Sequence, residues 1–117
     1  MIVQPEVPSA MRWDDDENLR GAVARWRDGE RGDDPAWKLR ELIKQLIGHY
    51  ATPLDEVIGA LGATREQIVT NARIAAGELR DAARIARHDR DENIRVNEAV
   101  YLENCAANIA TICGPFA

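Results

Sequence analysis

Apolar residues recur along most of the chain at intervals of three and four, the spacing of a helix that buries one side. The pattern is strongest over residues 35–50, where the apolar positions are Leu39, Leu42, Ile43, Leu46, Ile47 and Tyr50. Similar stretches cover residues 14–27, 54–61, 65–87 and 94–113. Few segments have the composition of strands. The pattern therefore predicts an all-α protein, a compact bundle of about five helices.

Residues that start or stop helices separate these stretches. The side chains expected to cap the first four helices are Asp14, Asp34, Thr52 and Thr64. Glu17 and Gln67 each stand three residues after one of these caps and would complete a capping box. Gly62 is expected to end the third helix, because glycine takes the left-handed conformation at little cost. Gly114 and Pro115 are expected to end the last helix.

The last two helices are long and lined with alanine. The fourth helix has a seam formed by Ile68, Ala72, Ala75, Leu79, Ala82 and Ala86. The last helix gathers Ile94, Tyr101, Cys105, Ile109, Ile112 and Phe116 near one face. Such seams imply close packing between helices. The two helices are expected to pair within the chain or across a homodimer, and residues 87–93 either continue the fourth helix or break it.

The chain begins differently. Pro5 and Pro8 exclude a helix at the start, so residues 1–12 are expected to form an extended arm. Residues 13–117 have the length of one domain, large enough to fold without disulfides or metal. Cys105 and Cys113 lie eight residues apart on one helix, about 12 Å, which is too far for a disulfide bridge.

The distribution of charge along the chain says more about possible partners than the overall composition does. The net charge is −5, but residues 37–90 carry +2 while both flanking segments are acidic. No apolar run reaches the roughly 18–20 residues of a membrane span, and the start lacks the pattern of a signal peptide. With two cysteines expected to be reduced, these observations favour a cytoplasmic protein without membrane contact.

The segment 53–87 has the dimensions of a helix-turn-helix, two helices joined by a tight turn at Gly62. Over about residues 54–80 it resembles the helix-turn-helix in region 4 of bacterial sigma factors, which reads promoter DNA. The matching positions are Leu54, Val57, Gly62, Thr64, Arg65, Glu66, Ile68, Ala75, Leu79 and Arg80. Val69, Asn71 and Gly77 depart from the family's pattern. An ordinary tight connection between two helices of a bundle remains the alternative.

The resemblance implies that Arg65, Glu66, Gln67 and Thr70 face base edges or phosphates. Arginine and glutamine suit bidentate contacts with bases. Four further arginines line one flank of the same helix, and would form a phosphate-binding stripe: Arg73, Arg80, Arg84 and Arg87. Alternatively, these arginines form a solvated face paired with Glu78, Asp81 and the acidic segments.

Other chemistry has little support in the sequence. His49 and His88 have no acid or cysteine at the spacing of a metal site, and no glycine-rich loop could hold a phosphate. We expect no metal, no cofactor and no enzymatic activity. Trp13, Trp26 and Trp37 either lock the first helix onto the bundle or, where exposed, anchor a partner.

Two functional hypotheses follow. The first is a small helix-turn-helix protein that binds DNA or RNA polymerase through Arg65, Gln67, Thr70, Arg73, Arg80 and Arg84. The second is an acidic protein-interaction module without DNA binding, such as a phage-type or accessory inhibitor. Its acidic face would imitate the phosphates of a nucleic acid and dock through Trp13, Asp14, Asp15 and Asp16.

Overall fold

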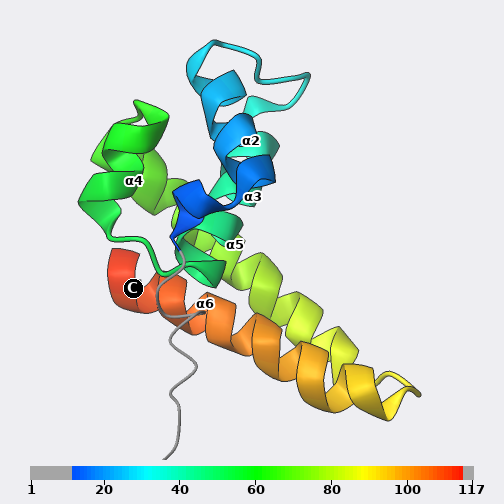
Figure 1. Ribbon diagram of the computed structural model, residues 1–117. Coiled ribbons are helices and arrows are strands. Elements are labelled where there is room, and N and C mark those ends of the chain that lie inside the picture. Colours follow the sequence, from blue (N-terminus) through cyan, green and yellow to red (C-terminus); the bar gives the residue numbers. More distant parts are fainter. Residues whose placement is uncertain (1–11, 115–117) are drawn as a thin grey trace, which may run out of the picture.

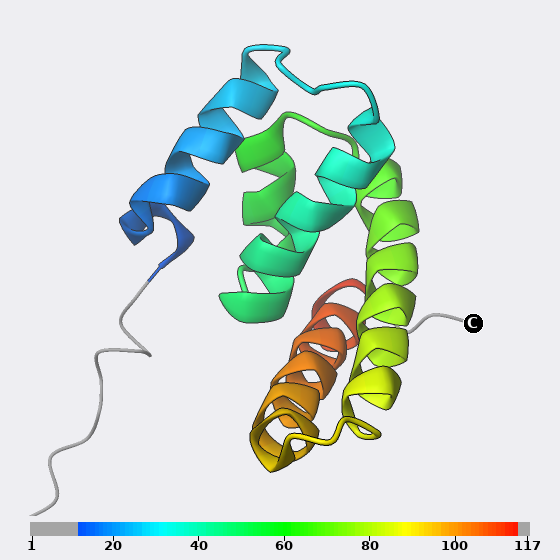
Figure 2. The same ribbon diagram turned by 90° about the vertical axis from the view of Figure 1, so that its right-hand side faces the viewer.

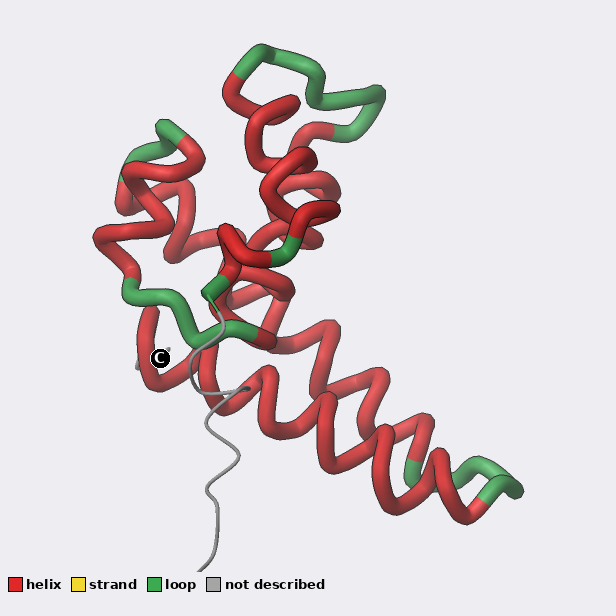
Figure 3. The backbone as a smooth tube through the Cα atoms, viewed as in Figure 1, coloured by secondary structure: helices red, strands yellow, loops and turns green. Residues whose placement is uncertain are grey.

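The computed structural model describes residues 12–114 and is built from helices and loops (Figure 1, Figure 3). The five α-helices are α2 (Glu17–Arg27), α3 (Pro35–Ile43), α4 (Leu54–Leu61), α5 (Arg65–Ala86) and α6 (Ala99–Cys113). Three short elements precede or extend them: the 3₁₀ turn η1 (Trp13–Asp15) and the π-helical turns η2 (Lys44–His49) and η3 (Ile94–Glu98). The predicted all-α bundle of about five helices is confirmed.

The long helix α5 organises the bundle. α6 runs back along α5 as an antiparallel hairpin, and α3 with η2 packs against both helices (Figure 2). α4 contacts α5 on one side and α2 on the other. The two alanine-lined helices therefore pair within the chain, so the seam between them is already occupied. None of the described helices combines the length and the apolarity needed to cross a membrane.

The core sits where α3, η2, α4 and α6 meet α5. Its largest fully buried side chains are Ile43, Leu46, Ile47, Val57, Leu61, Ile68 and Ile109. Three fully buried alanines on α5, Ala72, Ala75 and Ala76, let neighbouring helices approach closely. Most of these positions follow the apolar pattern of the sequence.

Two predicted caps are wrong. The first α-helix is capped by Asp16, whose side chain accepts a hydrogen bond from the backbone N–H of Leu19. Asp14 lies in the preceding 3₁₀ turn, because this extra turn delays the start of α2 by two residues. The N-cap of α4 is Pro53, with no side-chain cap, since Thr52 is buried and its backbone N–H donates to the carbonyl of Leu46.

Other details of the last three helices also differ from the pattern. The seam of α5 passes through Ala83 and not Ala82, which is exposed. Residues 87–93 interrupt the helix and do not continue it, because α5 ends at Ala86. Tyr101 lies at the exposed edge of α6. The predicted arm up to residue 11, and Pro115 and Phe116 at the other end, lie outside the described residues.

Candidate nucleic-acid interface

The connection between α4 and α5 is tight and well capped. Gly62 has a φ of 63°, and its N–H donates to the carbonyl of Ile58 at 2.9 Å, which closes the end of α4. The Thr64 hydroxyl accepts from the N–H of Gln67 at 3.1 Å, and the Gln67 side chain accepts from the N–H of Thr64 at 2.9 Å. The predicted turn and capping box are confirmed. They fix the start of α5 relative to α4.

A small set of buried side chains holds the crossing of the two helices. Val57 and Leu61 of α4 and Ile68 of α5 are almost completely buried. They place α4 against the apolar side of α5, the side that carries Ile68 and the buried alanines. The opposite side of α5 faces solvent. The first turns of α5 are therefore capped, packed on one side and open on their polar side.

Some predicted contact residues stand free on that open side. Thr70, Arg73 and Arg80 are exposed. Neither Arg73 nor Arg80 has an ion-pair partner within residues 12–114. Between them lies Ile74, which is 45% exposed although it is apolar. These side chains are available to a ligand without breaking an interaction inside the chain.

The other predicted contact residues are engaged. Arg65 pairs with Asp55 of α4 at 3.1 Å, and Gln67 is used by the capping box. Arg84 pairs with Asp81 one turn earlier on α5. These exposed ion pairs are weak and are readily exchanged for contacts with another molecule. Arg87 forms a two-pronged pair with Glu103 of α6, at 2.7 and 2.6 Å, so it belongs to the hairpin.

The positions that depart from the sigma-factor pattern are accommodated. Asn71 is half-buried, and its amide donates to the carbonyl of Gln67 at 2.8 Å, so no polar group is left without a partner there. Val69 is half-buried at the edge of the seam. Gly77 lies on the open side, where a Cβ would meet nothing within 4 Å.

The acidic N-terminal cluster is tied to neighbouring residues. The indole N–H of Trp13 donates to Glu56 of α4 at 2.7 Å, and Arg12 pairs with the same carboxylate. Asp14 accepts from the Arg12 side chain and Asp15 from its backbone N–H. These contacts raise the pKa of Arg12, through the Glu56 hydrogen bond first. Trp13 thus anchors η1 on α4.

Asp16 has a more constrained position than its neighbours. It accepts the capping hydrogen bond from Leu19 at 3.0 Å and a second one from the Tyr50 hydroxyl at 2.9 Å. Both hydrogen bonds favour the carboxylate, and together they lower the pKa of Asp16. The residue links α2 to the end of η2.

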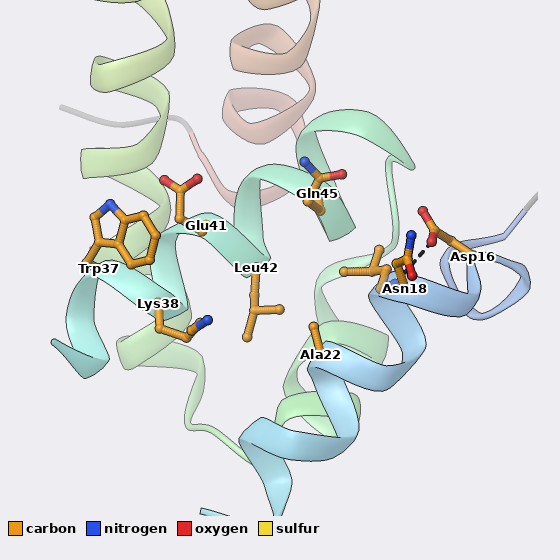
Figure 4. A pocket seen from close by; sticks show the side chains of 9 residues that line it. Asp16, Asn18, Ala22, Trp37, Lys38, Glu41, Leu42 and Gln45 are labelled. Carbon is orange, nitrogen blue, oxygen red and sulfur yellow. Dashed lines mark hydrogen bonds between the residues drawn. The ribbon is translucent and has the colours of Figure 1, made fainter. Parts of the chain in front are cut away.

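A groove of about 350 Å³ separates α2 from α3 (Figure 4). Leu42 and Ala22 line it on either side, and Asp16 and Asn18 stand at one end. Trp37, 49% exposed, lies at the other. The remaining lining residues are Leu19, Lys38, Glu41 and Gln45. The sequence singled out only Asp16 and Trp37 here; polar residues on the α2-facing side of the second helix were the missed signal.

The buried cysteines and the histidine next to them do not form a reactive site. His49 Nδ1 lies 2.7 Å from the Tyr101 hydroxyl. Burial, and then the hydrogen bond with Cys105, raises the pKa of Tyr101 to about 12. Burial raises the pKa of Cys105, and that of Cys113 to about 11, so both thiols stay protonated at neutral pH. Within residues 12–114 no three His, Cys, Asp or Glu side chains gather as metal ligands.

No family model matches the chain, and no curated protein or solved structure is significantly similar to it.

Proposed function

We propose that the chain binds duplex DNA through α4 and α5, with the first turns of α5 in the major groove. The observation that carries this proposal is the open polar side of α5. Thr70, Arg73 and Arg80 project there without a partner in the described residues, while α6 packs on the opposite, alanine-lined side. The turn at Gly62 holds α4 across the start of α5, as in DNA-binding helix-turn-helix units.

The length of α5 divides its polar residues into two groups. Arg65 and Arg73 are eight residues apart, about 12 Å along a helix, which matches the width of the major groove. Arg84 lies about 28 Å from Arg65, beyond one groove. We therefore assign base edges to residues 65–73 and phosphates to Arg80 and Arg84.

The net charge of −5 is compatible with this orientation. The acid-rich segments 14–17 and 28–34 belong to η1, α2 and the loop before α3. α2 packs against α4 and α3 rather than along α5. At 0.15 M salt the field of such charges is screened over about 8 Å.

The proposal is tested by titrating the protein into a fluorescent duplex at several salt concentrations. The two arginine–phosphate contacts, by Arg80 and Arg84, should give a slope of about −2 in a plot of log affinity against log salt. The double variant Arg73→Gln/Arg80→Gln removes one base contact and one phosphate contact, so it should relax the sequence preference and reduce that slope by about 1. Arg65 and Gln67 are less suitable, because their loss also affects the turn and the cap.

The matched control is Arg20→Gln/Arg25→Gln, which removes the same charge from the exposed surface of α2. It should leave the slope unchanged. Equal losses in the two double variants would show that only the overall charge matters. Absence of binding to any duplex at low salt, with RNA polymerase bound instead, would replace DNA by the transcription machinery as the partner.

A second candidate function rests on the groove between α2 and α3. An exposed tryptophan beside a groove with a carboxylate near each end, Glu41 next to Trp37 and Asp16 at the far end, fits a basic helix of a partner protein. In that case Trp37→Ala should abolish capture of the partner and leave the stability of the protein unchanged. Arg73→Gln/Arg80→Gln should have no effect on that capture.

A further inference from the structure

The groove between α2 and α3 has one charged lining residue without an ion-pair partner. Lys38 forms no ion pair within residues 12–114, and its side chain points across the groove towards α2 (Figure 4). The two carboxylates of the lining are occupied. Glu41 pairs with Lys44 at 2.8 Å, and Asp16 accepts the two hydrogen bonds described above. The groove therefore favours an occupant that brings a negative charge beside Lys38.

Apolar side chains line the middle of this groove, which is short. They are Leu19, Ala22 and Leu42. The lining residues of α3 and η2 run from Trp37 to Gln45, a distance of about 12 Å along a helix. That length accommodates about four residues of an extended segment. A contact of this size gives a separate molecule little affinity by itself. It is sufficient for a segment tethered to the same chain, whose effective concentration is on the order of millimolar.

The described part of the chain begins close to the groove. Arg12 pairs with Glu56 of α4, and the Trp13 indole donates to the same carboxylate, so the attachment point of the preceding segment is fixed. Arg12 stands four residues before Asp16, at one end of the groove, and the 3₁₀ turn between them spans about 8 Å. The Trp37 end is therefore about 20 Å from Arg12. Six residues in the polyproline II conformation span about 19 Å, so the segment before Arg12 reaches that end.

Residues 1–11 have the composition that this groove requires. Glu6 is the one charged side chain among them. Apolar residues recur at every third position: Ile2, Pro5, Pro8 and Met11. A polyproline II helix has three residues per turn, so this spacing predicts an apolar stripe along one side of the segment. Proline-rich segments of this kind dock in grooves lined by aromatic rings. The segment thus offers an apolar stripe with a single negative charge beside it.

We propose that residues 5–11 bind in the groove between α2 and α3, with the apolar stripe against Trp37 and with Glu6 paired with Lys38. One register satisfies both contacts, because six residues separate Glu6 from Arg12. The bound segment covers the exposed tryptophan and competes with any partner helix for the groove. A partner must displace it, so the segment regulates access to this surface. The inference does not require DNA binding, because the groove lies between α2 and α3 and not on the open side of α5.

The test is the backbone order parameter of Val7 and Ser9, measured by ¹⁵N relaxation on the full chain. In the wild type both amides should have values of about 0.85, the value of rigid backbone. Trp37→Ser removes the ring that the prolines contact, and it should lower both values below about 0.6, the range of flexible backbone. Trp37 is 49% exposed, so this variant should keep its helices, which circular dichroism verifies.

A charge reversal tests the register. Glu6→Lys should lower the two order parameters, and adding Lys38→Glu should restore them, because the pair then forms again with its signs exchanged. Glu30→Lys is the matched charge control, since Glu30 is exposed in the loop before α3 and does not line the groove. Ile85→Ser is the apolar control, an exposed isoleucine on α5 away from the groove. Both controls should leave the order parameters unchanged.

Three results would contradict the proposal. Order parameters below about 0.6 in the wild type overturn it and leave the groove to a partner protein. An ordered segment that Trp37→Ser leaves unchanged overturns it too, because the segment then contacts another face. Failure of Lys38→Glu to restore the order that Glu6→Lys removes overturns the proposed register.

Discussion

Gly48 determines how closely η2 approaches α6. A Cβ at this position would lie 3.2 Å from the Cβ of Cys105, closer than most packed carbons. The apolar pattern of the sequence could not identify this glycine, because a missing side chain matters only once its neighbour is known. The apolar residues on either side of it, Leu46 and Ile47, are buried as predicted.

Gly48→Ala should therefore destabilise the protein by about 1–3 kcal/mol, the range for overpacking a core. Gly77→Ala is the matched control, since a Cβ there meets nothing within 4 Å in the middle of α5. It should stabilise the protein by up to about 1 kcal/mol, because alanine favours the helix. Urea unfolding of both variants measures the two free energies. Effects of the same sign would contradict the close contact.

Asp16 should make stability depend on pH in the acid range. Its pKa is lowered from the ordinary 3.8, by the hydrogen bond from Leu19 first and that from Tyr50 second. A lowered pKa in the folded state gives stability that is complete above the unfolded pKa and is lost as pH falls through the folded one. The difference in unfolding free energy between wild type and Asp16→Asn should therefore be constant from pH 7 to about 5 and shrink below about 4.

Glu17→Gln is the control for that experiment. Glu17 is the exposed neighbour of Asp16 and does not accept the capping hydrogen bond. Its variant should differ less from the wild type at every pH. A constant difference between wild type and Asp16→Asn down to pH 3 would show that the two hydrogen bonds do not select the charged form.

At the scale of helices, the sequence predicts what local chemistry decides. Gly62 ends α4, and Thr64 with Gln67 starts α5, because these caps depend on residues within one turn. The π-helical turns η2 and η3 could not be predicted, since an extra residue in a turn is selected by packing against α6 and α5. The shift from Ala82 to Ala83 in the seam has the same origin, as the pattern contains alanine at both positions.

The cap of α5 should contribute measurably to stability. Thr64→Ala removes the hydroxyl that accepts from Gln67 and should cost about 1 kcal/mol. Thr70→Ala is the matched change one and a half turns later, at an exposed position of the same helix. It should be neutral or slightly stabilising. Thermal unfolding compares the two; equal losses would mean that the capping box has no role of its own.

For the whole molecule, the distribution of charge limits what the sequence could say about function. Free and paired arginines look alike in a sequence. Only the fold shows that Arg84 and Arg87 form ion pairs. Among the described residues, Arg73 and Arg80 have no ion-pair partner. The groove between α2 and α3 was equally hidden, because its two walls come from different helices. The sequence shows the acidic cluster at residues 14–16, but it could not show that each of these carboxylates accepts a hydrogen bond from a neighbouring residue.

The division between the core and residues 80–104, the distal hairpin at the outer end of α5 and α6, should appear in amide hydrogen exchange. Inner α5 buries Ile68 and Leu79 in the main core, whereas the only apolar residues of 80–104 that are classed as buried are alanines, and Leu102 is partly buried against the core. Opening the distal hairpin exposes little apolar area, so it should require less free energy than global unfolding. In dilute protein its amides should exchange faster than those of residues 68–79, which serve as the control on the same helix. Uniform rates along α5 would instead show that the distal hairpin and the core open as one unit.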